Sequence, residues 1–179
     1  TDNGLYRYDG SEFTLFSLDG DEDATKYSIN CIYLTSDEKL YVGTDNYGLY
    51  MYDNGTFQRV SEMYNLGVST INAMYEDDNK NLWIAASSGI FRLSSDGAEA
   101  LADDVVSGLS VGNISGHGDY VYAIANNDIL ITVDPERHVS ITNKSEYRVD
   151  DINSLYVDEN GNRYYGSAGY SILKIGTDG

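Results

Sequence analysis

Few residues in this chain combine a reactive type with the spacing that chemistry requires. His117 and His138 are the two histidines, and neither has a second histidine or a cysteine at metal-ligand spacing. Cys31 is the single cysteine, which excludes an intrachain disulfide and a zinc site made of thiolates. No nucleophile-elbow pattern accompanies these groups. We therefore predict no enzyme activity, no catalytic or metal-binding residue and no cofactor.

Two acidic runs have the alternating oxygen-bearing residues that a calcium loop uses. The run from Asp19 carries Ala24 and Asn30 where such a loop needs glycine at position six and glutamate at position twelve. The run from Asp158 occupies a place where the other copies of the repeat described next have an ordinary hairpin turn. Both runs are therefore interpreted as turns.

A repeat of about 41 residues positions these turns. Four related segments start at Ile29, Ile71, Val111 and Ile152, which are 42, 40 and 41 residues apart. Each is built from short alternating apolar runs and turn residues, without a helical stretch. This period and pattern are typical of β-propeller blades.

The repeat predicts an all-β fold of blades with four antiparallel strands. We expect about four blade equivalents in one propeller segment that is a fragment of a larger propeller. Trp83 stands in a second strand and is expected to pack between blades. Glycines mark the start of each third strand except in the third copy, which has Asn126 and Asn127 there. The expected boundaries are a partial blade 1–27, blades 28–68, 69–107 and 108–148, and a partial blade 149–179.

A ligand, if one binds, is expected at the loops that join second to third strands and neighbouring blades. In a propeller these loops gather on one face. Tyrosine offers a stacking surface for a sugar, while asparagine, aspartate and arginine offer paired hydrogen bonds, although loops contain these residues ordinarily. The candidate ligand-binding residues are Asp45, Asn46, Tyr47, Ser87, Asn126, Asn127, Arg148 and Tyr170.

The composition of the chain limits the classes of partner that it can bind. The chain has 11 lysines and arginines against 29 aspartates and glutamates, a formal charge of −18 that repels nucleic acid and anionic lipid. An apolar content of 41% is that of a folded globular protein. No apolar run approaches the length of a transmembrane helix. We expect no nucleic-acid partner.

The repeats resemble the two-component regulator propeller repeat. The likeness is carried by Ile71 to Trp83, by Gly43 to Asn46 and by Thr1 to Asp9. Proteins of that family use such blades as extracytoplasmic sensors of membrane-spanning signalling proteins, often histidine kinases and sometimes diguanylate cyclases, and many sense oligosaccharides. The resemblance implies a periplasmic or extracellular location as part of a membrane-anchored parent chain.

Three functions are compatible with these observations. The first is a non-catalytic sensor segment that binds a carbohydrate or another small polar ligand and signals, through other blades and a possible homodimer, to an output domain outside this segment. The second is a structural or protein-interaction propeller without a small ligand. A propeller lyase or glycosidase is placed last, because no shared acid and base can be identified.

Overall fold

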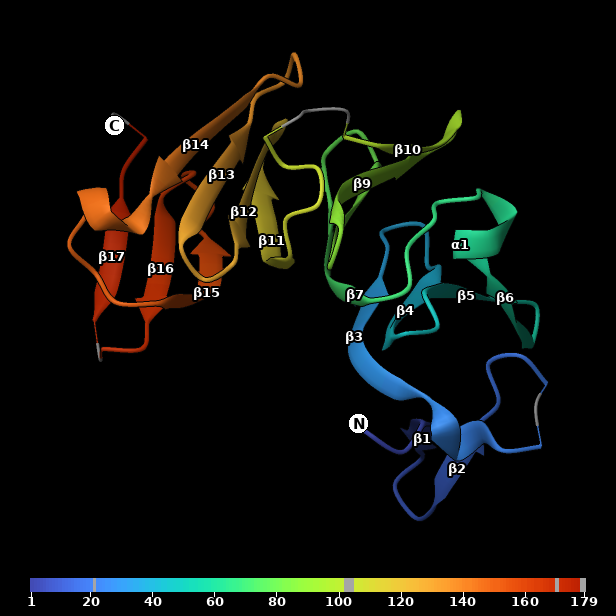
Figure 1. The fold of residues 1–179 in the computed structure, drawn as a ribbon. Coiled ribbons are helices and arrows are strands. Elements are labelled where there is room, and N and C mark those ends of the chain that lie inside the picture. The colour runs from blue at the N-terminus through green and yellow to red at the C-terminus, as the bar shows by residue number, and fades with distance from the viewer. Residues whose placement is uncertain (21, 102–104, 170, 178–179) are drawn as a thin grey trace.

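The computed structural model describes residues 1–20, 22–101, 105–169 and 171–177, and they form five antiparallel sheets. In each sheet the strands pair in sequence order, so every connection is a hairpin. Figure 1 shows the sheets following one another along the chain, from β1–β2 at the N-terminus to β15–β17 at the C-terminus. The prediction of an all-β fold built from four-stranded antiparallel sheets is confirmed.

The first sheet is a hairpin, the next three have four strands each and the last has three. Their bounds are β1 Leu5–Tyr8 and β2 Phe13–Phe16; β3 Ser28–Leu34, β4 Leu40–Asp45, β5 Leu49–Asp53 and β6 Thr56–Arg59; β7 Ile71–Glu76, β8 Leu82–Ala86, β9 Gly89–Ser94 and β10 Gly97–Ala100; β11 Val111–His117, β12 Tyr120–Ala125, β13 Ile129–Val133 and β14 Val139–Asn143; β15 Ile152–Val157, β16 Arg163–Ser167 and β17 Ile172–Ile175.

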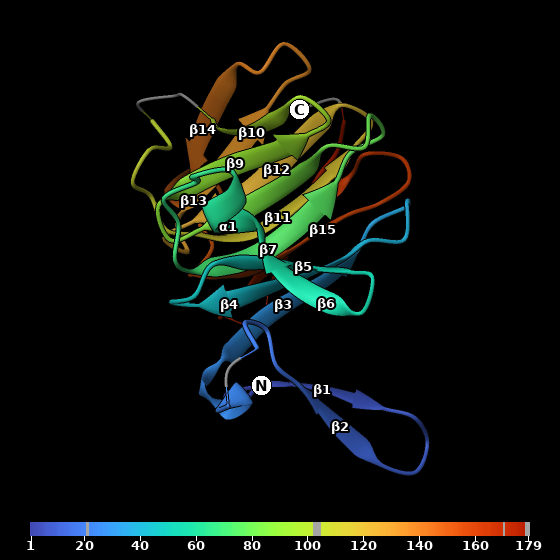
Figure 2. The same ribbon diagram turned by 90° about the vertical axis from the view of Figure 1, so that its right-hand side faces the viewer.

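The sheets stack face to face through their first strands. Strands β3, β7, β11 and β15 lie side by side in succession (Figure 2), and each contacts the next. Each of them has a register shift at the same place, after Ile29, Ile71, Val111 and Ile152. A β-bulge of this kind re-aims a side chain. In β3 and β7 the bulge residue is an asparagine, and its side chain donates to the main chain of the neighbouring sheet.

Four apolar clusters fill the spaces between successive sheets. Trp83 belongs to the cluster between the third and fourth sheets, where it is 4% exposed, and its Nε1 donates to Asp77 Oδ2 at 2.8 Å. The predicted packing of this ring between blades is confirmed. Cys31 lies against the cluster between the second and third sheets, and burial raises the pKa of its thiol to about 11.

Two local features were not predicted from the sequence: short helical turns between sheets, and the backbone conformation of the β12–β13 loop. Short helical turns occupy connections where no helix was expected: α1 over Val60–Met63, and 3-10 turns over Ala24–Lys26 and Lys144–Glu146. In the β12–β13 loop, Asn126 and Asn127 adopt φ of 53° and 58°. Asparagine tolerates this left-handed region better than most residues, so it replaces the glycine of the other copies.

Candidate functional site

The predicted ligand loops gather at one end of the sheets, which we call the loop face. It comprises the β4–β5, β8–β9, β12–β13 and β16–β17 loops together with the connections between sheets. Main-chain hydrogen bonds join the two sets: Gly48 N donates to Ser69 O at 2.6 Å, and Asn126 N donates to Ser110 O at 2.9 Å. Loops anchored in this way present side chains from a rigid backbone.

The first candidate loop is mostly engaged in holding the sheets together. Asp45 Oδ1 accepts a hydrogen bond of 3.1 Å from Thr70 Oγ1. Tyr47 is half-buried, its ring lies edge-on to Tyr27 at 4.8 Å, and its carbonyl accepts from Arg59 Nε at 2.8 Å. Asn46, at φ 69°, is the exposed residue of the three.

The other described candidates are exposed on the loop face. Ser87, Asn126, Asn127 and Arg148 are all exposed. Their main chains are fixed, since Ser87 N donates to Thr70 O at 3.2 Å and Asn127 O accepts from Ile152 N at 2.9 Å. Tyr170 lies outside the described residues. Amide, hydroxyl and guanidinium groups are therefore available at this end, but none of these residues lines any of the four cavities described.

The calcium-like turns use their carboxylates internally. Asp158 accepts hydrogen bonds from the Asn162 side chain at 2.8 Å, the Asn162 main chain at 2.9 Å and Tyr164 OH at 3.1 Å. The Asn162 side chain is the main reason that the pKa of Asp158 lies below its usual range. Asp19 Oδ2 accepts from Tyr50 OH at 2.8 Å and Tyr27 OH at 3.2 Å. These contacts give both carboxylates a structural role.

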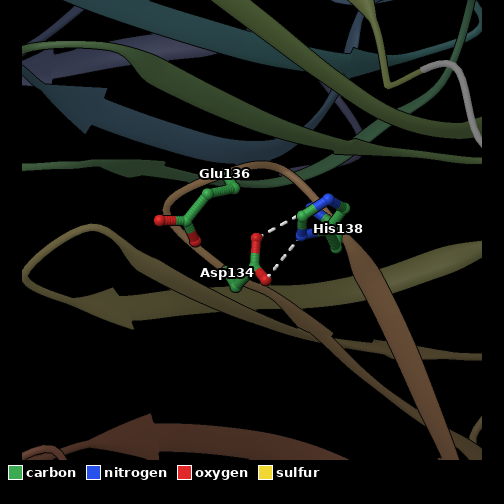
Figure 3. Close-up of side chains that lie close together, drawn as sticks. All are labelled: Asp134, Glu136 and His138. Atoms are coloured by element: carbon green, nitrogen blue, oxygen red, sulfur yellow. Dashed lines mark hydrogen bonds and ion pairs between the residues drawn. The ribbon is translucent and has the colours of Figure 1, made fainter.

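One cluster with metal-ligand atoms occurs in the β13–β14 turn (Figure 3). Atoms of Asp134, Glu136 and His138 lie within 4.8 Å of one another. The sequence shows no histidine or cysteine partner for His138, and carboxylates two and four residues before it are common in turns without a metal. Asp134 Oδ1 accepts from His138 N at 2.8 Å and Oδ2 lies 3.0 Å from His138 Nδ1. The imidazole is 80% exposed, so we assign the cluster to closing the hairpin.

The architecture defines a segment of a β-propeller. Residues 65–88 match the family model of the two component regulator propeller, so the predicted resemblance to that repeat is confirmed. A comparison with curated proteins found no match. Within the described residues, no helix has the length and apolarity needed to cross a membrane.

Solved structures with the same fold include extracellular domains. The extracellular domain of BT3049 from B. thetaiotaomicron, named as a hybrid two component system, is 16% identical with a TM-score of 0.72, over 97% of this chain and 24% of that one. The extracellular domain of BT4673, another system of that organism named as hybrid, is 20% identical with a TM-score of 0.60, over 79% and 19% of the chains. The chain thus spans about a quarter of the length of the BT3049 domain and about a fifth of the length of the BT4673 domain.

The fold likeness extends to an enzyme. Virginiamycin B lyase from Staphylococcus aureus is 11% identical with a TM-score of 0.62, over 92% of this chain and 59% of that one. At this level of identity the similarity concerns the fold, which hosts many functions.

Proposed function

We propose that this chain is a non-catalytic segment of an extracytoplasmic sensor propeller, within a larger bacterial membrane signalling protein. The observation that carries the proposal is the superposition of 97% of the chain on the extracellular domain of BT3049. The match of residues 65–88 to the two component regulator propeller supports the same role. Other blades and an output domain of the parent chain are its first partners.

The ligand is a carbohydrate or another small polar molecule bound at the loop face. Asn126 and Asn127 support this site, because their main chains are held while their side chains are exposed. Ser87 and Arg148 add a hydroxyl and a guanidinium on the same end of the sheets. Such groups give paired hydrogen bonds to sugar hydroxyls. Binding changes the output to the extent that the ligand prefers one arrangement of the blades or of a homodimer.

The test is thermal unfolding of the chain with a panel of oligosaccharides that differ in sugar composition and linkage. We expect one class to raise the melting temperature, and Asn126→Gly with Asn127→Gly to abolish the rise. Glycine removes both amides and keeps the left-handed backbone. Asn54→Gly is the matched control, because Asn54 has φ 48° in the β5–β6 turn at the other end of the sheet. An undiminished rise in the double variant would remove these residues from the site.

A protein-interaction propeller is the second candidate. Large apolar side chains are exposed on the last sheet, with Tyr156 at 64% and Ile172 at 74%. An exposed apolar surface of this kind favours contact with another protein surface. Insensitivity of the melting temperature to every sugar, together with concentration-dependent self-association, would favour this function.

A further inference from the structure

An apolar groove lies between the β1–β2 hairpin and the second sheet, at the N-terminal end of the stack (Figure 2). The hairpin forms one wall and strands β3 to β6 form the other. Apart from Arg7, its lining side chains are aliphatic or aromatic. Its volume of about 250 Å³ is below the roughly 300 to 1,000 Å³ of most small-molecule sites, so we interpret it as space for the side chains of a further element.

Strand β3 is uncovered on the side that faces this groove. Ile32 is 54% exposed, whereas Met74 and Ile114, which hold the same register position in β7 and β11, are 8% exposed. Met74 and Ile114 are buried in the clusters that join their sheets to the preceding ones. Ile32 has no such cover, because the first sheet has two strands where the next three sheets have four.

The two strands of the first sheet correspond to the third and fourth strands of the others. Gly4 N, before β1, donates to Tyr27 O at 2.8 Å, just as Gly48 N, before β5, donates to Ser69 O at 2.6 Å. Within the described residues β1 pairs with β2 alone, whereas β5, β9 and β13 each pair with two strands. An unpaired strand edge is a template for an added strand.

The register of the other sheets indicates what an added strand would place opposite Arg7. The aromatic residue of the second strand pairs with a cationic residue of the third strand in two sheets, Trp83 with Arg92 and Tyr164 with Lys174. Lys174 Nζ lies 5.3 Å from the centre of the Tyr164 ring, which is a cation–π contact. Arg7 has the equivalent position in β1. An aromatic ring on the added strand would therefore face the guanidinium of Arg7.

We propose that this groove is the docking site of a β-hairpin of the same repeat, made of a first and a second strand and supplied by another part of the larger signalling protein. Its second strand pairs with the free edge of β1 and places an aromatic ring opposite Arg7. Its first strand covers Ile32 and Leu34, as β3 lies against β7. The source of the hairpin rests on the proposed function, whereas the groove and the strand edge do not.

The test uses the whole chain and a labelled synthetic peptide of residues 71–86, which form the β7–β8 hairpin in the folded chain. Fluorescence anisotropy should show saturable binding of one peptide per chain. Arg7→Gln in the chain should weaken binding about two- to fivefold, the effect of one cation–π contact. Trp83→Leu in the peptide should also weaken binding. Since both changes remove the same contact, their effects should not add when they are combined.

Ile32→Asp tests the apolar wall of the groove. It should weaken binding about tenfold or more, because the docked hairpin would bury the new carboxylate. Ile141→Asp is the matched control, since Ile141 is also an exposed apolar residue but lies on β14 and lines none of the described cavities. The control should bind the peptide as the unmodified chain does. Thermal unfolding of both variants checks that they fold.

Three results would overturn the docking site: no saturable binding at millimolar peptide, an unchanged affinity in Ile32→Asp, or equal affinities of the two peptides for the unmodified chain. Sedimentation velocity tests the source of the hairpin. Self-association of the chain that Ile32→Asp abolishes would overturn the assigned source and make a second copy the occupant. The oligosaccharide test at the loop face does not involve this groove, so the two proposals fail separately.

Discussion

The side-chain amide of Asn72 donates a hydrogen bond of 2.7 Å to the main-chain carbonyl of Val111, and so joins the first strands of two neighbouring sheets. Asn30 makes the equivalent bond to Ile71 at 3.1 Å, whereas the third junction uses Asn113, one residue beyond the bulge, which donates to Asn153 at 3.2 Å. In β3 and β7 the asparagine is the extra residue of the β-bulge, which directs its side chain toward the neighbouring sheet. These asparagine side chains therefore hold neighbouring blades together by hydrogen bonds.

Removing this side-chain hydrogen bond is expected to lower the stability of the folded chain. Asn72→Ala removes the hydrogen bond to the carbonyl of the buried Val111 and should lower the free energy of unfolding by about 1 to 2 kcal/mol. Asn153→Ala is the control, because Asn153 follows Ile152 at the bulge of its strand but is exposed and its amide donates to no described group. Urea unfolding followed by circular dichroism measures both. Equal losses would show that the inter-sheet bond contributes nothing.

Substitutions of Trp83 test the packing between the third and fourth sheets. Trp83→Ala empties a large buried site and should cost about 3 to 5 kcal/mol in the free energy of unfolding. Trp83→Phe should cost less, because it keeps most of the ring while removing the bond to Asp77. Denaturant titration of both variants gives the difference. A loss below about 1 kcal/mol for the alanine variant would mean that the ring is not part of the core.

The fold was predictable because the same pattern of apolar strands and turn residues recurs in each blade. Features that occur in one blade alone depend on contacts with residues far away in the sequence, which the pattern does not contain. Helix α1 spans only four residues and leaves no periodicity in the sequence. At the candidate loop face, the spacing predicted which loops share an end. It could not predict that the ring of Tyr47 would be engaged by Tyr27, because Tyr27 lies in the connection between the first two sheets and reaches the β4–β5 loop only in the folded chain.

Substitution of Gly48 tests the close approach between the start of β5 and Ser61. Its φ is 82°, and a Cβ there would meet the Ser61 hydroxyl and lie 3.0 Å from Ser61 Cβ. Gly48→Ala should therefore cost well over the roughly 1 kcal/mol that the left-handed backbone alone imposes on alanine. Gly55→Ala is the matched control, with φ 92° and nothing within 4 Å of the added carbon. Thermal unfolding that ranks the two variants equally would contradict the contact.

Buried tyrosines predict an alkaline limit to stability. Burial raises the pKa of Tyr165 from its ordinary value of 10.0 to about 12, and burial likewise raises the pKa of Tyr75 to about 12. The folded chain holds these protons more tightly than the unfolded chain. Their contribution to stability is therefore fully present below pH 10 and is lost as the pH rises from 10 to about 12.

Tyr165→Phe isolates one of these protons. Tyr165 is 1% exposed, and the rise of its pKa to about 12 corresponds to roughly 2 to 3 kcal/mol of the alkaline loss. Unfolding free energies measured by urea titration at pH 8 and pH 11 should fall less in this variant than in the parent chain. Tyr156→Phe, at an exposed tyrosine, is the control. If Tyr165→Phe falls as steeply as the parent between those pH values, the proton on Tyr165 does not couple to folding, and the alkaline limit must arise from other groups.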